Sequence, residues 1–270
     1  MNTKTHKGTA LITGASSGIG AVYADRLARR GYDLILVARD LKRLDVLASE
    51  LTAATGRKVG VIRADLSVTA DLRAVEQRLA EDSSITMLVN NAGLGATKSL
   101  IDSDPADLDA LININVLALT RLARAAAPGM VARGNGTIIN ISSAVALAPE
   151  VLNGTYAGTK SYVLTLTQSL HHEIGAKGVQ VQAVLPGAIA TPFWDRAGLA
   201  VSNLPPGIVM SPDDLVDAAL DGLDRKELVT IPSLPEIADW DRFEADRRAL
   251  GPNLSRSSPA ARYLKQQATA

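Results

Sequence analysis

Tyr156 and Lys160 stand four positions apart in a stretch whose pattern predicts a helix over 155–176. Residues spaced by four lie on one helix face, so a phenol and an ammonium can address the same point. The ordinary pKa of a tyrosine, about 10, is too high for efficient proton exchange near neutrality, and a nearby cation favours the phenolate. The pair therefore has the chemistry of a general acid and base, although this spacing alone is also typical of an ordinary surface pair.

A glycine-rich segment at 13–20, TGASSGIG, has the character of a phosphate-binding turn. It follows an apolar run and opens a helical pattern, where backbone N–H groups and a helix N-terminus can meet a pyrophosphate. No Gly-Lys-Ser/Thr of a Walker loop follows, and the strand–turn–helix context favours a dinucleotide site over an ordinary loop. The residues expected to form this site are Gly14, Ser16, Ser17, Gly18, Ile19 and Gly20.

Apolar runs and helical patterns alternate along the chain, and they must position these groups. Strands are predicted at 9–13, 33–38, 58–63, 86–90, 137–141 and 179–185. These runs lack polar alternation, as is typical of parallel strands covered on both faces. Helices are predicted at 19–30, 41–55, 68–81, 105–133 and 155–176. The alternation predicts an α/β fold with a doubly wound parallel sheet, Rossmann-type, in three α/β/α layers.

The rhythm changes after residue 185. An apolar, proline-containing segment at about 188–212 is predicted to form a substrate lid, followed by a helix at 212–223 and a short strand at 228–231. Phe193 and Trp194 in this segment suit either a substrate pocket or a core or subunit contact. A charged, partly helical C-terminal extension is expected at about 235–270. Without an internal linker or repeat, residues 1–270 are predicted to form one domain.

Acidic and basic residues balance at 28 each, and the chain contains no cysteine. The balance argues against nucleic acid or an anionic membrane as a partner, and the missing thiols exclude disulfides and thiolate metal sites. We recognise no signal peptide and no apolar run long enough to span a bilayer. A cytoplasmic protein without a resident metal is expected.

The segment 13–20 resembles the glycine motif of the short-chain dehydrogenase/reductase family, and the resemblance extends to about residue 210. Asn91, Ala92 and Gly93 end a segment similar to the family's Asn-Asn-Ala-Gly motif. Ser143 stands thirteen positions before Tyr156, as in the family's catalytic set, and Asn115 matches its fourth member. Gly158 departs from the usual alanine between the tyrosine and the lysine, and could permit a close approach of backbone or ligand.

The resemblance implies a role for each of these side chains. Tyr156 would exchange a proton with the substrate oxygen, and Ser143 would hydrogen-bond that oxygen as charge develops. Lys160 would lower the tyrosine pKa and hold the nicotinamide ribose. Asn115 would position Lys160 through an ordered water. Hydride would come from the nicotinamide cofactor itself.

The end of the second strand bears on the choice of cofactor. Ala38 occupies the position that is acidic in NAD-preferring relatives, and Arg39 follows it, as in NADPH-preferring members. Asp40 is expected to cap the next helix. NADP(H) is therefore favoured over NAD(H). The resemblance further assigns cofactor contacts to Asp65, Leu66, Pro186, Gly187, Ile189 and Thr191.

These features predict an NADP(H)-dependent oxidoreductase that reduces a lipophilic ketone or aldehyde, its partner being a small-molecule carbonyl or alcohol. An NAD-dependent alcohol or steroid-type dehydrogenase is the alternative within enzymes. A nucleotide-binding regulator without turnover is the alternative from another class. By analogy with the family, a homodimer or homotetramer is expected.

Overall fold

A computed structural model of the chain describes residues 6–205 and 207–264. Contacts divide the chain into two units, Met1–Pro232 and Ser233–Ala270. All of the residues predicted to bind the cofactor or to act in catalysis belong to the first unit. The organisation as one domain with a C-terminal extension stays a prediction.

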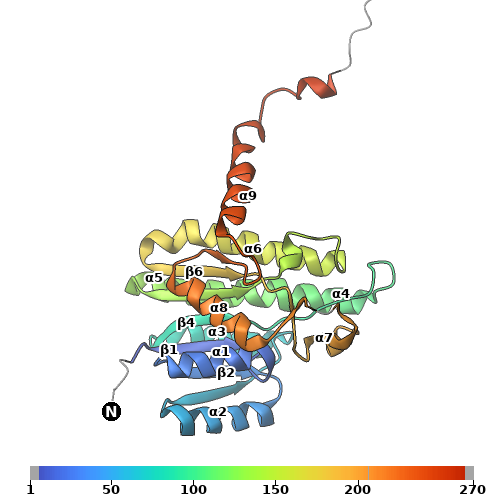
Figure 1. The fold of residues 1–270 in the computed structure, drawn as a ribbon. Coiled ribbons are helices and arrows are strands. Elements are labelled where there is room, and N and C mark those ends of the chain that lie inside the picture. Colours follow the sequence, from blue (N-terminus) through green and yellow to red (C-terminus); the bar gives the residue numbers. More distant parts are fainter. Residues whose placement is uncertain (1–5, 206, 265–270) are drawn as a thin grey trace, which may run out of the picture. The chain divides into compact units, whose positions relative to one another are not determined.

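The first unit is built on a parallel sheet (Figure 1). In the described residues it has seven strands, in the order β3-β2-β1-β4-β5-β6-β9, and every neighbouring pair is parallel. The strands are β1 (Thr9–Thr13), β2 (Asp33–Ala38), β3 (Val59–Arg63), β4 (Ile85–Asn90), β5 (Gly136–Ile141), β6 (Val179–Val184) and β9 (Val229–Thr230). This order confirms the predicted doubly wound, Rossmann-type sheet.

Helices cover both faces of the sheet, because successive strand residues point to opposite sides. In β1, Ile12 enters the apolar cluster under one helix layer and Leu11 enters the cluster under the other. The first layer contains α1 (Gly18–Arg29), α2 (Leu41–Thr55) and α8 (Pro212–Asp224). The second contains α3 (Thr69–Glu81), α5 (Leu119–Arg133) and α6 (Gly154–Ile174).

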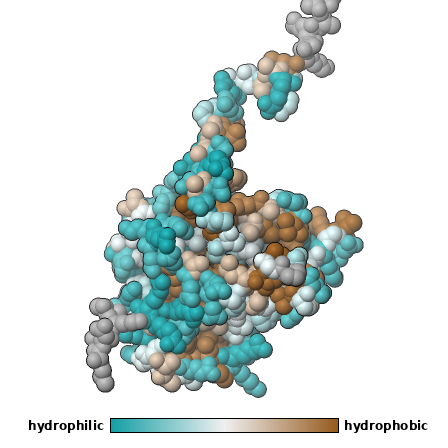
Figure 2. Space-filling model, in the orientation of Figure 1, coloured by the Kyte–Doolittle hydropathy of each residue, from teal (hydrophilic) through white to brown (hydrophobic). Residues whose placement is uncertain are grey.

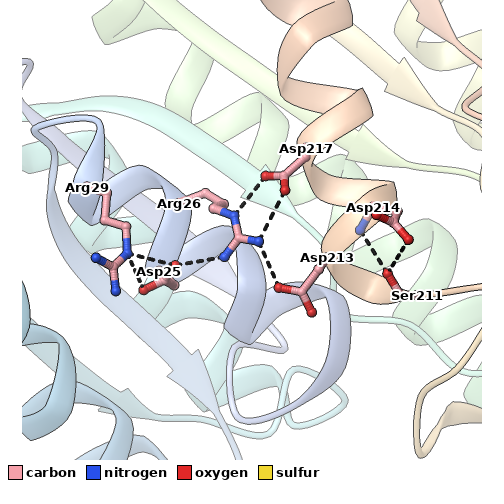
Figure 3. Close-up of polar contacts among 7 residues, drawn as sticks. All are labelled: Asp25, Arg26, Arg29, Ser211, Asp213, Asp214 and Asp217. Atoms are coloured by element: carbon pink, nitrogen blue, oxygen red, sulfur yellow. Dashed lines mark hydrogen bonds and ion pairs between the residues drawn. The ribbon is translucent and has the colours of Figure 1, made fainter.

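An ion-pair network joins α1 to α8 (Figure 3). Arg26 Nε lies 2.7 Å from Asp217 Oδ1, and Arg26 Nη2 lies 2.7 Å from Asp213 Oδ1. The hydrogen bond from Arg26 is the largest effect on the pKa of Asp217 and lowers it. The helix that follows the glycine turn is thereby fixed to the helix that follows residue 210.

Strand order reverses between β1 and β4, and open α/β sheets bind ligands at such a switch point. At this point the side chain of Thr13 connects β1 to the segment that follows β4. Thr13 Oγ1 accepts the backbone N–H groups of Asn91 and Ala92, each at 3.0 Å, and donates to Val89 O at 3.3 Å. The glycine turn after β1 and the segment after β4 are therefore held side by side.

The region predicted as one helix at 105–133 has a wider turn in its middle. A π-helical segment, Asn113–Ala118, separates α4 (Pro105–Ile112) from α5. The whole stretch Pro105–Arg133 is long and apolar enough to cross a membrane by length and composition, contrary to our expectation that no stretch would be. Core helices meet the same criterion, and α5 packs on β4 and β5.

A second, two-stranded parallel sheet lies at the base of the segment predicted to be a lid. It pairs β7 (Ala188–Ile189) with β8 (Val209–Met210). Between them runs a segment that contains the short helix α7 (Phe193–Arg196). Its role as a lid stays a prediction.

The second unit contains α9 (Ile237–Ala249). The rings of Trp240 and Phe243 contact one another with centroids 5.4 Å apart. Glu244 pairs with Arg247 at 2.9 Å and with Arg248 at 3.5 Å. This part of the predicted C-terminal extension is therefore helical.

Candidate active site

A cavity of about 960 Å³ opens at the carboxyl ends of the central strands. It gathers the predicted site residues Gly14, Ser16, Ser17, Gly18, Ile19, Arg39, Asp65, Leu66, Asn91, Ala92, Gly93, Ser143, Tyr156, Lys160, Pro186, Gly187, Ile189 and Thr191. The predicted residues Gly20 and Asn115 do not line it. Apolar side chains gather on the surface around α7 and at the tip of the loop before α4 (Figure 2).

The glycines of the turn allow three chain segments to meet. Gly14 has φ +66°, and a Cβ there would lie 2.9 Å from Ala92 Cα. Gly18 has φ +56°, and a Cβ there would lie 3.0 Å from Thr191 Cγ2. A Cβ on Gly20 would lie 2.5 Å from Gly14 O, so this glycine permits close packing of α1 on the turn. The first residues of α1 border the cavity, where a helix N-terminus favours an anionic group.

The predicted catalytic side chains converge on the cavity from β5 and α6. Tyr156 and Lys160 are each 6% exposed, and Ser143 follows the end of β5. Lys160 Nζ donates to Ile141 O at 3.0 Å and lies 5.8 Å from the centroid of the Tyr156 ring. The ammonium therefore faces the ring of the tyrosine and the end of β5.

Burial dominates the ionisation of this pair. It raises the pKa of Tyr156 to about 12, and a hydrogen bond with Ser143 opposes the rise. Burial also lowers the pKa of Lys160 to about 8. The tyrosine shift is opposite to the predicted one, because desolvation disfavours the charged form of each group. The phenol is accordingly protonated at neutral pH, as a proton donor must be.

Asn115 lies inside the π-helical segment and connects two parts of the site. Its Oδ1 accepts the N–H of Leu94 at 2.8 Å, and its Nδ2 donates to Leu94 O at 2.9 Å and to Thr159 Oγ1 at 3.1 Å. A π-helical turn alters side-chain direction locally, and such turns are frequent at functional sites. A Cβ on Gly93 would lie 3.3 Å from Asn115 Oδ1 and 3.5 Å from Lys160 Nζ, so Gly93 leaves room for both. The water link to Lys160 stays a prediction.

Two arginines border the cavity where β2 ends. Arg39 lies 4.0 Å from Asp65 Oδ2, and its side chain is 63% exposed. Asp40 caps α2 by accepting the N–H of Arg43 at 3.1 Å, as predicted. Arg43 also lines the cavity, and we had not predicted it. Its signal was its position four residues after Arg39, within the first turn of a predicted helix.

Hydrogen bonds from Ser67 lower the pKa of Asp65, and Arg39 lowers it further. The carboxylate accepts the backbone N–H of Ser67 at 3.0 Å and its hydroxyl at 2.7 Å. Asp65 is thus held as a charged group after the end of β3, where it lines the cavity.

Phe193 and Trp194 both line the cavity, which favours the pocket interpretation of these aromatic residues. The indole N–H of Trp194 donates to Ile189 O at 2.8 Å, and the two rings meet edge to face with centroids 5.7 Å apart.

Gly158 has open space where a side chain would be, with no atom within 4 Å of an added Cβ. It therefore does not serve a close approach of backbone, contrary to the use suggested from the sequence.

The sequence from residue 8 to residue 200 matches the family model described as short chain dehydrogenase. The chain belongs to the short-chain dehydrogenase family. It is an oxidoreductase of that family, with the Rossmann-type sheet of its solved members.

Two solved structures resemble the chain over nearly its whole length. A short-chain dehydrogenase from Sphingobium yanoikuyae in complex with NADPH is 50% identical, with a TM-score of 0.92 and coverage of 95% of this chain and 100% of that one. A bulky-bulky ketone specific alcohol dehydrogenase from Comamonas testosteroni is 47% identical, with a TM-score of 0.89 and coverage of 96% and 100%.

A curated relative is similar over a shorter stretch. The very-long-chain 3-oxoacyl-CoA reductase of Anas platyrhynchos is 37% identical over 186 residues, which cover 67% of this chain and 60% of the reductase. The chain thus spans about three fifths of the length of this relative.

Proposed function

We propose that this enzyme reduces the carbonyl group of a lipophilic ketone or aldehyde with NADP(H), using Ser143, Tyr156, Lys160 and Asn115. One observation carries the proposal. Tyr156 packs in an apolar cluster with Leu111, Val145 and Ala157, while its hydroxyl shares a hydrogen bond with Ser143. The hydroxyl groups of Ser143 and Tyr156 thus lie in the cavity next to this apolar cluster.

The chain's own residues would handle the substrate oxygen and its proton. Bound NADPH supplies the hydride that turns the carbonyl carbon into an alcohol carbon. Ser143 and Tyr156 hydrogen-bond the carbonyl oxygen, and the protonated phenol of Tyr156 gives its proton to that oxygen as negative charge develops. Lys160 stabilises the phenolate that remains, since its ammonium lies over the same ring. Oxidation of the alcohol reverses these steps.

The residues around the cavity fit a phosphorylated dinucleotide. The glycine turn and the first turn of α1 offer backbone N–H groups to the pyrophosphate. Arg39 and Arg43 supply cations where β2 ends, and Ala38 brings no carboxylate there. The NADPH complex of the Sphingobium yanoikuyae relative supports the same choice.

Replacing one atom tests the proposal. Tyr156→Phe removes the proton donor and is expected to lower kcat for ketone reduction by about 10²–10⁴-fold, the usual contribution of acid–base catalysis. NADPH binding and the melting temperature should be retained. Tyr162→Phe is the matched control, because Tyr162 lies on the same helix but pairs with Thr120 at a surface position. It should reduce ketones at the wild-type rate.

The result also separates the two classes of function. A nucleotide-binding regulator without turnover would bind NADPH and reduce none of a panel of ketones and aldehydes. If Tyr156→Phe consumed NADPH with a ketone as fast as the wild type does, the proposed roles would be incorrect.

A further inference from the structure

Phe193 projects from α7 toward the loop that follows β4, where it lies directly over Gly95. A Cβ built on Gly95 would lie 2.2 Å from Phe193 Cζ and 2.8 Å from both Cε atoms. No real Cβ makes such contacts, so the end of the ring occupies the space that any side chain at position 95 would need. Only glycine at this position leaves the ring where it is.

The same ring forms the wall beside the proton donor. Its centroid lies 6.0 Å from that of Tyr156, and the two planes are inclined by 48°. Phe193 also packs against the apolar cluster that includes Val145 and Tyr156, next to Leu94 and Leu152. The two rings contact one another and both line the cavity, so the position of the Phe193 ring limits the room for a substituent beside Tyr156.

Contacts hold α7 at both of its ends, so the ring cannot retreat with its backbone. The indole of Trp194 is fixed to Ile189 O, and the hydroxyl of Thr97 donates to Ala197 O at 2.6 Å. The second bond ties α7 to the same loop that carries Gly95. The seat of the ring on Gly95 thus fixes its position relative to Tyr156.

The surrounding wall indicates what passes beside the ring. Beyond the two catalytic hydroxyls the wall is apolar, and it is formed by Val145, Ala148, Leu152, Leu199, Leu204 and Ile208. Arg196 also lines the cavity, but its Nε donates to Pro192 O at 3.2 Å. This lining suits an uncharged group such as an aryl or branched alkyl chain.

We propose that the contact between Phe193 and Gly95 is the size filter of this enzyme, and that it selects among uncharged ketones by the bulk of the substituent that packs against Phe193 beside Tyr156. The proposal rests on the proposed ketone reduction. It predicts effects of opposite sign for changes at the two positions, which a general loss of packing would not produce.

The test uses the ratio of kcat/KM for isobutyrophenone to kcat/KM for acetophenone, two ketones that differ in branching on one side of the carbonyl. Gly95→Ala displaces the ring from Gly95 into the cavity that the ring lines, and is expected to lower this ratio by on the order of tenfold. Phe193→Ala removes the ring and is expected to raise the ratio by a similar factor. Gly60→Ala is the matched glycine control, because an added Cβ there meets only an ordinary contact of 3.8 Å, and it should leave the ratio unchanged.

The double variant Gly95→Ala/Phe193→Ala gives the decisive comparison. Without the ring, the new methyl group has nothing to displace, so the double variant should match Phe193→Ala and the two effects should not add. Unchanged ratios in both single variants, or additive effects in the double variant, would overturn the size filter. Should Gly95→Ala fail to fold, an unchanged ratio in Phe193→Ala would still overturn it.

These outcomes are separate from a failure of the proposed function. If the wild type reduces both ketones, loses turnover on Tyr156→Phe and keeps its ratio in Phe193→Ala, the function stands and the size filter falls. If the wild type reduces neither these nor any other ketone or aldehyde, the proposed function falls, and the size filter falls with it.

Discussion

Asn153 donates a hydrogen bond from its side-chain amide to Lys98 O, 2.6 Å away, while its Oδ1 accepts the N–H groups of Thr155 and Tyr156 at 2.8 and 3.2 Å. The same amide donates to Ser103 Oγ at 3.2 Å. One buried side chain therefore caps the helix that carries Tyr156 and connects it to the loop after β4. We infer that Asn153 would act on the proposed reaction as a positioning residue, through Tyr156.

Substitutions at position 153 separate the capping of α6 from the hydrogen bond to Lys98 O. Asn153→Ser keeps a capping hydroxyl but cannot reach Lys98 O, so we expect near-wild-type stability with kcat lowered by about tenfold and KM little changed. Asn153→Ala loses both functions and should also be destabilised by about 1 kcal/mol. Melting curves and steady-state kinetics measure the two effects. A wild-type kcat in Asn153→Ser would mean that the tie to Lys98 does not position Tyr156.

Arg39 is expected to discriminate between the two nicotinamide cofactors. A hydrogen bond to a charged group contributes about 1.5–3 kcal/mol, so Arg39→Ala should weaken NADPH binding by about 10- to 100-fold. NADH has no 2′-phosphate, and its affinity should stay within about twofold. Fluorescence titration with both cofactors measures this difference. If Arg39→Ala weakened the binding of NADPH and NADH equally, Arg39 would not bind the 2′-phosphate.

The pKa of Lys160, lowered by burial to about 8, gives carbonyl reduction a dependence on pH. Below this value the ammonium is charged and can stabilise the phenolate; above it the amine is neutral and that support is lost. The pKa of Tyr156, raised to about 12, keeps the phenol protonated throughout. We therefore expect kcat/KM for reduction to fall as the pH rises through about 8.

The Ser143→Ala variant tests whether the fall in rate at high pH is independent of the serine hydroxyl. The wild-type profile is measured with a ketone at saturating NADPH, and again with the Ser143→Ala variant, which should lower the rate without removing the fall at high pH. A rate that stays constant up to pH 10 would show that Lys160 does not titrate in this range.

Gly158 offers a stabilising substitution. It lies inside α6 and an added Cβ would meet no atom within 4 Å, while glycine in a helix interior costs about 0.5–1 kcal/mol relative to alanine. Gly158→Ala should therefore raise the free energy of unfolding by about that amount. Denaturant titration measures the change. A lower stability would reveal a contact that the structure does not contain.

The strands, the helix layers and the lining of the cofactor half of the cavity were predictable because their signals are local. Apolar runs placed β1 and β2 at their observed bounds, and the ends of the other strands lie within one residue of the prediction. The glycines of the turn were also predictable, because positive φ angles and close backbone contacts favour glycine.

Other features depend on segments that meet only in three dimensions. The seat of Phe193 on Gly95 joins residues almost a hundred positions apart, and the tie from Asn153 to Lys98 joins two loops. The direction of the Tyr156 pKa shift was also wrong, because spacing along a helix does not reveal burial.

The pairing of β7 with β8 has a consequence for how substrate preference can diverge among enzymes with this fold. The segment between β7 and β8 begins after Ile189 and ends at Val209, at two points held together by the pairing of these strands. Lengthening a loop with joined ends adds little entropic cost, because closure entropy grows only with the logarithm of length. Insertions and deletions after Thr191 can therefore change the shape of the pocket without changing the glycine turn or the central sheet.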